Sequence, residues 1–196
     1  MCRNITADPT PNTVPVFSTF LIYPDGKFCP SLSEIQNNQS TFHRQVDEMA
    51  EGIDDRPALF FLEIDAVGTS TCLDSSELAA WEADLRFEIE ALTALPHTVV
   101  YVEGGAANED SPRYIAHVLS GVCVVNKRFV CQGLRGFYVN GTHFDWTLNE
   151  IHLGESCGQL SPVADQQRDG HLVHRPPGTC PCDARQALSA LASRRT

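Results

Sequence analysis

Four apolar runs lie at wide intervals along the chain, and each has the composition of a buried strand. They are rich in β-branched and aromatic residues, and turn-forming or charged residues follow them. Strands buried on both faces show continuous apolar runs of this kind, whereas half-exposed strands alternate apolar and polar residues. The pattern therefore predicts buried strands over residues 14–22, 58–64, 98–102 and 136–139.

The intervals between these runs carry apolar residues three and four positions apart, which places them on one face of a helix. Asp74 precedes Glu77 by three residues, as in an N-terminal capping box, and Pro96 would end the helix that begins there. Ser111 followed by Pro112 has the composition of another helix start. We expect helices over residues 33–53, 74–92 and 111–122.

Strands and helices alternate in this pattern, which is typical of a parallel sheet covered by helices, either open or closed into a barrel. In both architectures the active site lies at the carboxyl ends of the strands. Polar side chains gather after each predicted strand. These clusters occupy residues 23–29, 63–65, 103–105 and 140–146.

Composition narrows the choice of partners. The formal charge of −11 makes nucleic acid and anionic membrane surfaces poor partners, whereas a neutral polysaccharide is compatible with it. The first residues lack the apolar run of a signal peptide. The 8 cysteines nevertheless favour an oxidising compartment, although their pairing cannot be read from the count.

Glu63 and Asp65 stand two positions apart at the end of the second predicted strand, so an extended backbone would project both carboxyls to the same side. Acid–base cleavage of a glycosidic bond requires a pair of carboxylates. The acid of such a pair must have its pKa raised from about 3.9 to roughly 6, equivalent to about 3 kcal/mol. From spacing alone, the alternative that Asp65 merely caps the following loop is equally open.

The segment Leu62-Glu63-Ile64-Asp65-Ala66 resembles the Glu-Pro-Asp strand end of glycoside hydrolase family 6, the cellulases and cellobiohydrolases. Further segments resemble the family in the same order along the chain, from about residue 14 to 157, and most closely its bacterial members. These segments are residues 53–58, 96–105, 108–113, 134–147 and 149–155. The run 134–147 contains the family's pattern of Arg-Gly-Phe followed by Asn, His and Trp.

The resemblance implies inverting hydrolysis of β-1,4-glucosidic bonds in cellulose or a related β-glucan. It also implies an α/β fold, an incomplete distorted parallel β/α barrel of the TIM-like family 6 type that lacks its first and last strands. Residues 1–160 would form the partial catalytic domain, and residues 161–196 a divergent tail in which basic residues outnumber acidic ones. We expect a secreted monomer that binds a polysaccharide or oligosaccharide and needs no cofactor or metal.

The resemblance also assigns roles to single residues. Asp65 aligns with the catalytic acid, and Cys29 and Cys72 align with a disulfide around the strand that carries it. Trp146 aligns with an aromatic platform for a sugar ring, although a Trp after a strand is often simply core. The residues expected to bind substrate are Glu63, Glu103, Asn140, His143 and Trp146.

Several positions depart from the family pattern. Phe28 stands where a second Asp commonly supports the acid, which leaves Asp25 as the nearest carboxylate. Asp165 resembles the late motif that contains a candidate base, but it follows Glu155 at a short spacing. Residues 121–132 look like an insertion that would form a cysteine-closed hairpin. A truncated, non-catalytic remnant that at most binds oligosaccharide is therefore the alternative function.

Overall fold

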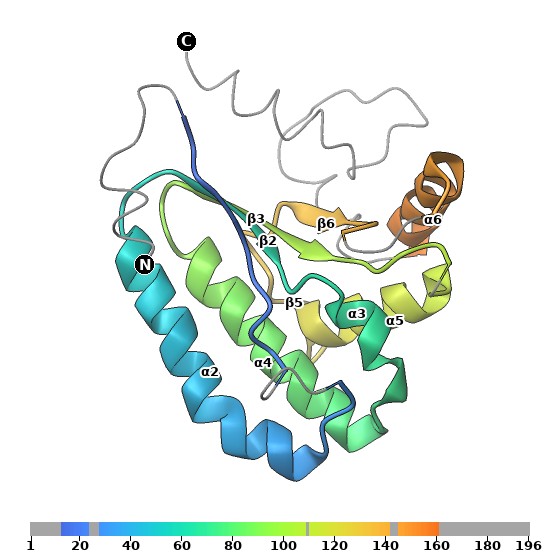
Figure 1. Cartoon of the computed structure of the whole chain (residues 1–196), viewed down its shortest axis with the longest axis horizontal. Helices are drawn as coiled ribbons and strands as arrows, with labels where there is room; N and C mark the ends of the chain where they lie inside the picture. The colour runs from blue at the N-terminus through green and yellow to red at the C-terminus, as the bar shows by residue number, and fades with distance from the viewer. Residues whose placement is uncertain (1–12, 24–27, 109, 142–144, 161–196) are drawn as a thin grey trace.

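The computed structural model describes residues 13–23, 28–108, 110–141 and 145–160. Its centre is a four-stranded parallel sheet in the order β1-β2-β3-β6, shown in Figure 1. Phe61 of β2 pairs with Tyr101 of β3, which pairs in turn with Gly136 of β6. The four strands are β1 (Val16–Ser18), β2 (Ala58–Leu62), β3 (Thr98–Glu103) and β6 (Gly136–Tyr138).

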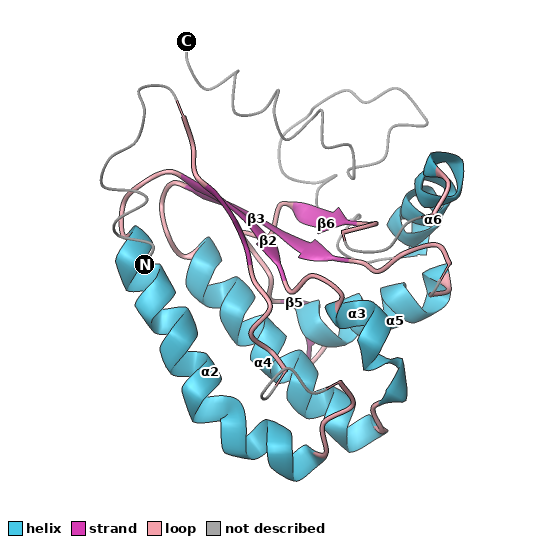
Figure 2. Ribbon diagram, viewed as in Figure 1, coloured by secondary structure: helices cyan, strands magenta, loops and turns pink. Residues whose placement is uncertain are grey.

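The longer helices lie beside this sheet, with α2, α4 and α5 on one side of it (Figure 2). Helix α2 packs against α4, and α5 packs against both α4 and α6. The helices α2, α4, α5 and α6 span Leu32–Ile53, Ser75–Thr93, Pro112–Cys123 and Thr147–Leu160. A short helix α3 (Ala66–Thr69) and a 3-10 turn η2 (Ser70–Cys72) connect β2 to α4. The fold is thus α/β with a parallel sheet.

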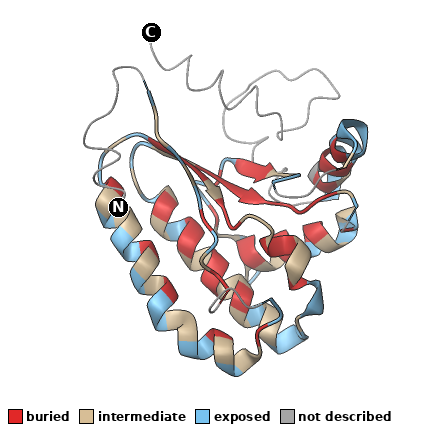
Figure 3. Ribbon diagram, viewed as in Figure 1, coloured by how far each residue is buried: buried red, intermediate tan, exposed pale blue. Residues whose placement is uncertain are grey.

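The hydrophobic core fills the layer between the sheet and these helices. Phe60, Leu62 and Phe137 are at most 1% exposed, as are Trp81 and Ile89 on α4. Figure 3 shows a buried face along α4, whereas the outer side of α2 is exposed. The strand and helix predictions for this layer are confirmed, because continuous apolar runs and helical spacing both mark residues that the layer encloses.

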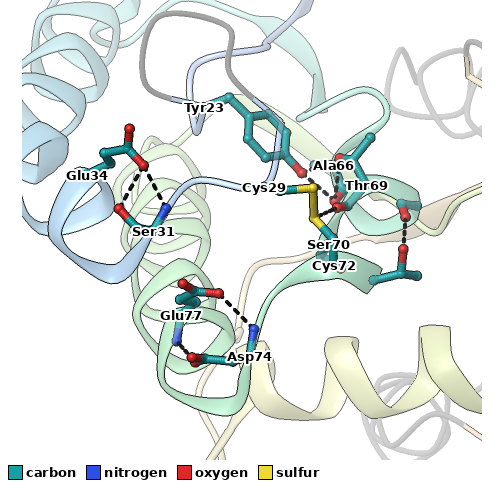
Figure 4. Close-up of a disulfide and its surroundings, with 12 residues drawn as sticks. Tyr23, Cys29, Ser31, Glu34, Ala66, Thr69, Ser70, Cys72, Asp74 and Glu77 are labelled. Atoms are coloured by element: carbon teal, nitrogen blue, oxygen red, sulfur yellow. Dashed lines mark hydrogen bonds between the residues drawn. A yellow bond between two sulfur atoms is a disulfide. The ribbon is translucent and has the colours of Figure 1, made fainter.

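The helix starts follow the predicted capping chemistry (Figure 4). Asp74 Oδ1 accepts hydrogen bonds from the N–H groups of Ser76 at 2.7 Å and Glu77 at 2.9 Å, and Glu77 Oε2 accepts the Asp74 N–H at 2.8 Å. Ser111 accepts the Tyr114 N–H at 3.2 Å. A further box at the start of α2, in which Glu34 accepts the Ser31 N–H at 2.8 Å, sets that helix start one residue before the predicted position.

The first predicted strand is shorter than expected. The run 14–22 keeps a ladder only over Val16–Ser18, although Thr19 still donates its N–H to the Phe61 carbonyl at 3.1 Å. The N–H groups of Leu21 and Ile22 instead bind the Glu63 carboxyl. An apolar run shows that a segment is buried but not which acceptors its N–H groups find, so this boundary was wrong.

The predicted hairpin within residues 121–132 is present. Strands β4 (Val124–Val125) and β5 (Arg128–Phe129) pair antiparallel, and a Cys123–Cys131 disulfide closes them. Helix α6, in contrast, has no counterpart among the elements that periodicity predicts. Its glycines weaken the helical pattern, and it is held by burial of Leu153 and Cys157.

The predicted barrel is not observed in the described part of the chain, where the strands form an open sheet. The predicted tail, residues 161–196, lies outside the described residues, as does the Asp165 within it. Among the helices that are described, none is both long enough and apolar enough to cross a membrane.

Candidate active site

Asp65 lies on a turn with left-handed backbone at the carboxyl end of β2. Its φ is 72°, that of Glu63 is 49°, and Asp65 occupies the N-cap position of α3. Non-glycine residues adopt such angles only where surrounding contacts hold them there. The extended geometry that would project both carboxyls to one side is therefore absent, and that part of the sequence reasoning was wrong.

The Glu63 side chain is buried in the core and does not project to the same side as that of Asp65. Its side chain is 0% exposed, and its carboxyl accepts the N–H groups of Leu21 and Ile22 at 3.0 Å. Its own N–H donates to Thr19 Oγ1 at 2.9 Å. These bonds join the segment after β1 to the turn that carries Asp65. In this structure Glu63 is buried and holds the backbone, and its role in binding substrate stays a prediction.

Glu103 joins three strand ends in a similar way. One carboxyl oxygen accepts the Asp65 N–H, and the other accepts the Gly141 N–H at 3.2 Å. The side chain is only 2% exposed. A Cβ atom at Gly141 would approach Glu103 Oε1 to 2.5 Å, so the absence of a side chain there permits this contact. Glu103 thus fixes Asp65 through its backbone, which differs from the direct substrate contact that we expected.

The disulfide implied by the family resemblance is present, because Cys29 and Cys72 are bonded with their Cα atoms 5.6 Å apart. Figure 4 shows the Tyr23 side chain beside this bond, pointing at the short helix after Asp65. The Tyr23 hydroxyl donates to the Ala66 carbonyl at 2.9 Å and also contacts Thr69 Oγ1. Burial raises the pKa of this hydroxyl well above its usual value. The sequence places Tyr23 only in the polar cluster of residues 23–29 and does not predict this contact, because its partners lie more than 40 residues away.

Phe28, the residue in place of a supporting Asp, belongs to an aromatic cluster. Its ring centroid lies 5.5 Å from that of Tyr23 and 6.2 Å from that of Phe20. Half of the Phe28 side chain is exposed. This apolar surface replaces the carboxylate that the family pattern would supply here. Asp25, the nearest alternative, lies outside the described residues.

The carboxyl end of β6 leads to the remaining predicted substrate contacts. Asn140 is exposed with a φ of 62°, and its N–H binds the Gly105 carbonyl at 3.0 Å, which brings the loops after β3 and β6 together. Trp146 is 81% exposed at the start of α6, so its ring is available to a ligand and does not belong to the core. His143 lies outside the described residues.

The strand ends are strongly acidic, which affects neighbouring phenols. The pKa of Tyr138 lies well above its usual value, first because of burial and then because of the negative charges on Glu103 and Glu63. Its hydroxyl donates to the Leu62 carbonyl at 3.4 Å. Among the described residues, no cluster of three or more side chains has the composition of a metal site. The histidines and cysteines of the tail, His171, His174, Cys180 and Cys182, are not described.

Comparison with solved structures identifies the fold. The chain is similar to endoglucanase Cel6 from Mycobacterium tuberculosis, solved in complex with methyl-cellobiosyl-4-deoxy-4-thio-β-D-cellobioside, with a TM-score of 0.61 and 24% identity over 77% of this chain and 49% of that one. It is also similar to the glycoside hydrolase family 6 enzyme of Orpinomyces sp. Y102, with a TM-score of 0.62 and 15% identity over 78% of this chain and 48% of that one. For endoglucanase CEL6B from Humicola insolens the TM-score is 0.59 and the identity 14%, over 79% of this chain and 52% of that one.

These likenesses place the protein among α/β folds with a parallel sheet. More narrowly, the described residues have the fold of part of a family 6 glycoside hydrolase, as the sequence resemblance implied. The chain spans about half the length of these solved structures. No family model and no curated protein matches the chain.

Proposed function

We propose that the chain is the acid-bearing part of a secreted glucanase that hydrolyses β-1,4-glucosidic bonds with inversion. Asp65 would protonate the leaving oxygen while water attacks the opposite face of the sugar. The observation that carries the proposal is the turn of Asp65, which ends β2 and is fixed from two sides, by Glu103 and by the Cys29–Cys72 disulfide. An acid whose backbone is held in place at a parallel strand end has the fixed position that such catalysis requires.

The proposed partners of Asp65 follow from the family resemblance. Asp165 or Asp25 would assist the attacking water, at a carboxyl separation of about 6.5–9.5 Å in an inverting site. Trp146, exposed on the structure, would stack against a glucose ring. Asn140 and His143 would bind sugar hydroxyls. Two disulfides among the described residues favour an extracellular location for this activity.

The test is turnover of a soluble cellulose derivative by Asp65→Asn, with the anomer of the product followed by NMR. We expect a loss of at least about 100-fold, the usual contribution of general acid catalysis, and α-product from the unmodified chain. Asp47→Asn, which removes the same charge from the exposed side of α2, is the matched control. Equal activity in the two variants would show that Asp65 is not the catalytic acid.

A non-catalytic protein that binds oligosaccharide is the second candidate. The exposed Trp146 favours it, as does Phe28 in the place where the family pattern has a supporting carboxylate. Titration with cellotetraose, followed by Trp146 fluorescence, separates the two functions. Saturable quenching without any turnover would select the binding function, whereas turnover lost in Asp65→Asn would select the hydrolase.

A further inference from the structure

Two buried glutamates, Glu63 and Glu88, interact with each other through their side chains. Glu63 follows β2, Glu88 is one of the buried residues of α4, and both side chains are 0% exposed. An ionised carboxylate in such a layer is costly unless it is paired or fully hydrogen-bonded. Two adjacent carboxylates would also repel each other, so the pair is expected to retain a proton.

Hydrogen bonding decides which of the two is charged. The Glu63 carboxyl accepts the Leu21 N–H with both oxygens and the Ile22 N–H with one, all at 3.0 Å. Within the described chain no backbone N–H is recorded on the Glu88 carboxyl, and the side chains that act on it are those of Glu63 and Thr19. Because N–H donors favour a carboxylate, the charge belongs on Glu63 and the proton on Glu88.

Among the described residues, no positively charged group is recorded as acting on this pair. The groups whose charge or hydrogen bonding affects either carboxyl, within the described chain, are the pair itself, Thr19 and the N–H groups of Leu21 and Ile22. The phenols of Tyr23 and Tyr138 face the same charge, which raises their pKa values further. Burial, and then the charge on Glu63, raises the pKa of Glu88 well above its usual range.

We propose that Glu88 is a positioning residue for Asp65, acting as the protonated partner that lets Glu63 remain a buried carboxylate. Glu63 stands two residues before Asp65, and its carbonyl accepts the Ala66 N–H at 3.0 Å on the other side of that residue. Glu88 thereby supports both the segment 19–22 and the turn. The link to catalysis rests on the proposed function of Asp65, but the link to the turn does not.

The stability that the Glu63–Glu88 pair contributes depends on pH. The proton on Glu88 is bound in the folded state at pH values where an exposed glutamate is already ionised. The stability that it contributes is therefore complete at low pH and is lost as the pH rises through the titration of the pair. Above that point two negative charges would face each other inside the core.

Glu88→Gln tests this directly, because the amide keeps a donor towards Glu63 and cannot ionise. The melting temperature of the unmodified chain should fall more steeply between pH 5 and 9 than that of Glu88→Gln, so that their difference grows by about 3 °C or more. Glu90→Gln, an exposed position on the same helix, should keep the slope of the unmodified chain. Equal slopes in all three proteins would overturn the proposal.

The positioning role has its own readout. In Glu88→Ala, which removes the donor, the amides of Leu21 and Ile22 should exchange with deuterium at least about tenfold faster, while Glu88→Gln keeps their protection. Should Glu88→Ala fail to fold, Glu88→Met, of similar size and without a donor, takes its place. Unchanged exchange in the variant that folds would overturn the role.

Activity is measured last and separately. Glu88→Ala should lower kcat with little change in KM, and Glu88→Gln should restore kcat. If Asp65→Asn leaves turnover unchanged, the proposed function has failed, while melting and exchange still decide the role of Glu88. Faster exchange with unchanged kcat, in a chain that depends on Asp65, would contradict positioning of the acid.

Discussion

Glu103 is only 2% exposed, yet it binds the backbone of the Asp65 turn and the backbone of the loop after β6. Replacing it with Gln leaves one oxygen for two N–H donors, those of Asp65 and Gly141. One buried donor then lacks an acceptor, which costs about 1–3 kcal/mol. We therefore expect Glu103→Gln to lower the free energy of unfolding by this amount in urea titrations, and to reduce kcat because the acid is less well held.

The control for this prediction is Glu51→Gln, an exposed glutamate near the end of α2. Its substitution removes the same charge from the chain without removing a buried acceptor. A loss of stability shared equally by both variants would mean that net charge, and not the contact with the Asp65 turn, explains the effect.

At the scale of residues, the sequence indicated which residues belong near the site better than it indicated their burial and contacts. Asp65 could be proposed as the acid because several segments follow the order of a known family, whereas Glu63 and Glu103 were expected at the substrate and are buried. Their positions depend on positive φ angles and on distant N–H donors that no local spacing encodes. Glu88 was missed for the same reason, since a lone glutamate in a helix is usually solvated.

The two disulfides of the described chain close loops of different length. Cys29 and Cys72 are 43 residues apart, whereas Cys123 and Cys131 are separated by 8. Removing the first by the double substitution to Ser should cost about 4 kcal/mol, against about 2.5 kcal/mol for the second, because the longer loop gains more entropy when unfolded. Urea unfolding of the two double variants measures the difference.

The same comparison separates stability from function. Loss of Cys29–Cys72 should also lower activity at temperatures where the protein stays folded, because this bond lies beside α3. Loss of the hairpin disulfide should affect stability alone. If both double variants lose activity equally while folded, the first bond has no particular role at the site.

Element boundaries show what a pattern can and cannot predict. Caps at Asp74 and Ser111 were predicted correctly, because their chemistry lies within a few residues. The short β1 and the helix α6 were not, because each depends on partners that are distant in sequence. Leu21 finds its acceptor in Glu63, and Glu150 of α6 accepts the Ala107 N–H at 3.1 Å.

At the scale of the whole molecule, β1 and β6 are the outer strands of the described sheet. Edge strands offer unpaired backbone groups to other chains, and Val16 of β1 is 60% exposed. We expect the purified chain to associate as its concentration rises, and Val16→Lys to shift it towards the monomer predicted from sequence. Light scattering after size exclusion measures both. Thr41→Lys on α2 adds the same charge elsewhere and should leave association unchanged.

The parallel sheet and its helices were predictable because they repeat a simple alternation, and the likeness to family 6 structures agrees with that prediction. Closure into a barrel was predicted from the resemblance alone. Closure depends on strands beyond the β6 edge, and the described residues end with a helix, α6, that packs on α5. Local patterns indicate which strands exist, but not whether enough of them meet to close a ring.

The hydrogen bonds that hold the Asp65 turn also determine how readily a protease would cleave it. Surface loops are usually nicked where they open alone, at little cost. This turn is bound through Glu63 to residues 21 and 22, through Glu103 to residue 141, and through Ala66 to the Tyr23 hydroxyl. It cannot open without releasing segments from three regions of the chain. The loop that carries the proposed acid should therefore be among the last on the surface to be cut.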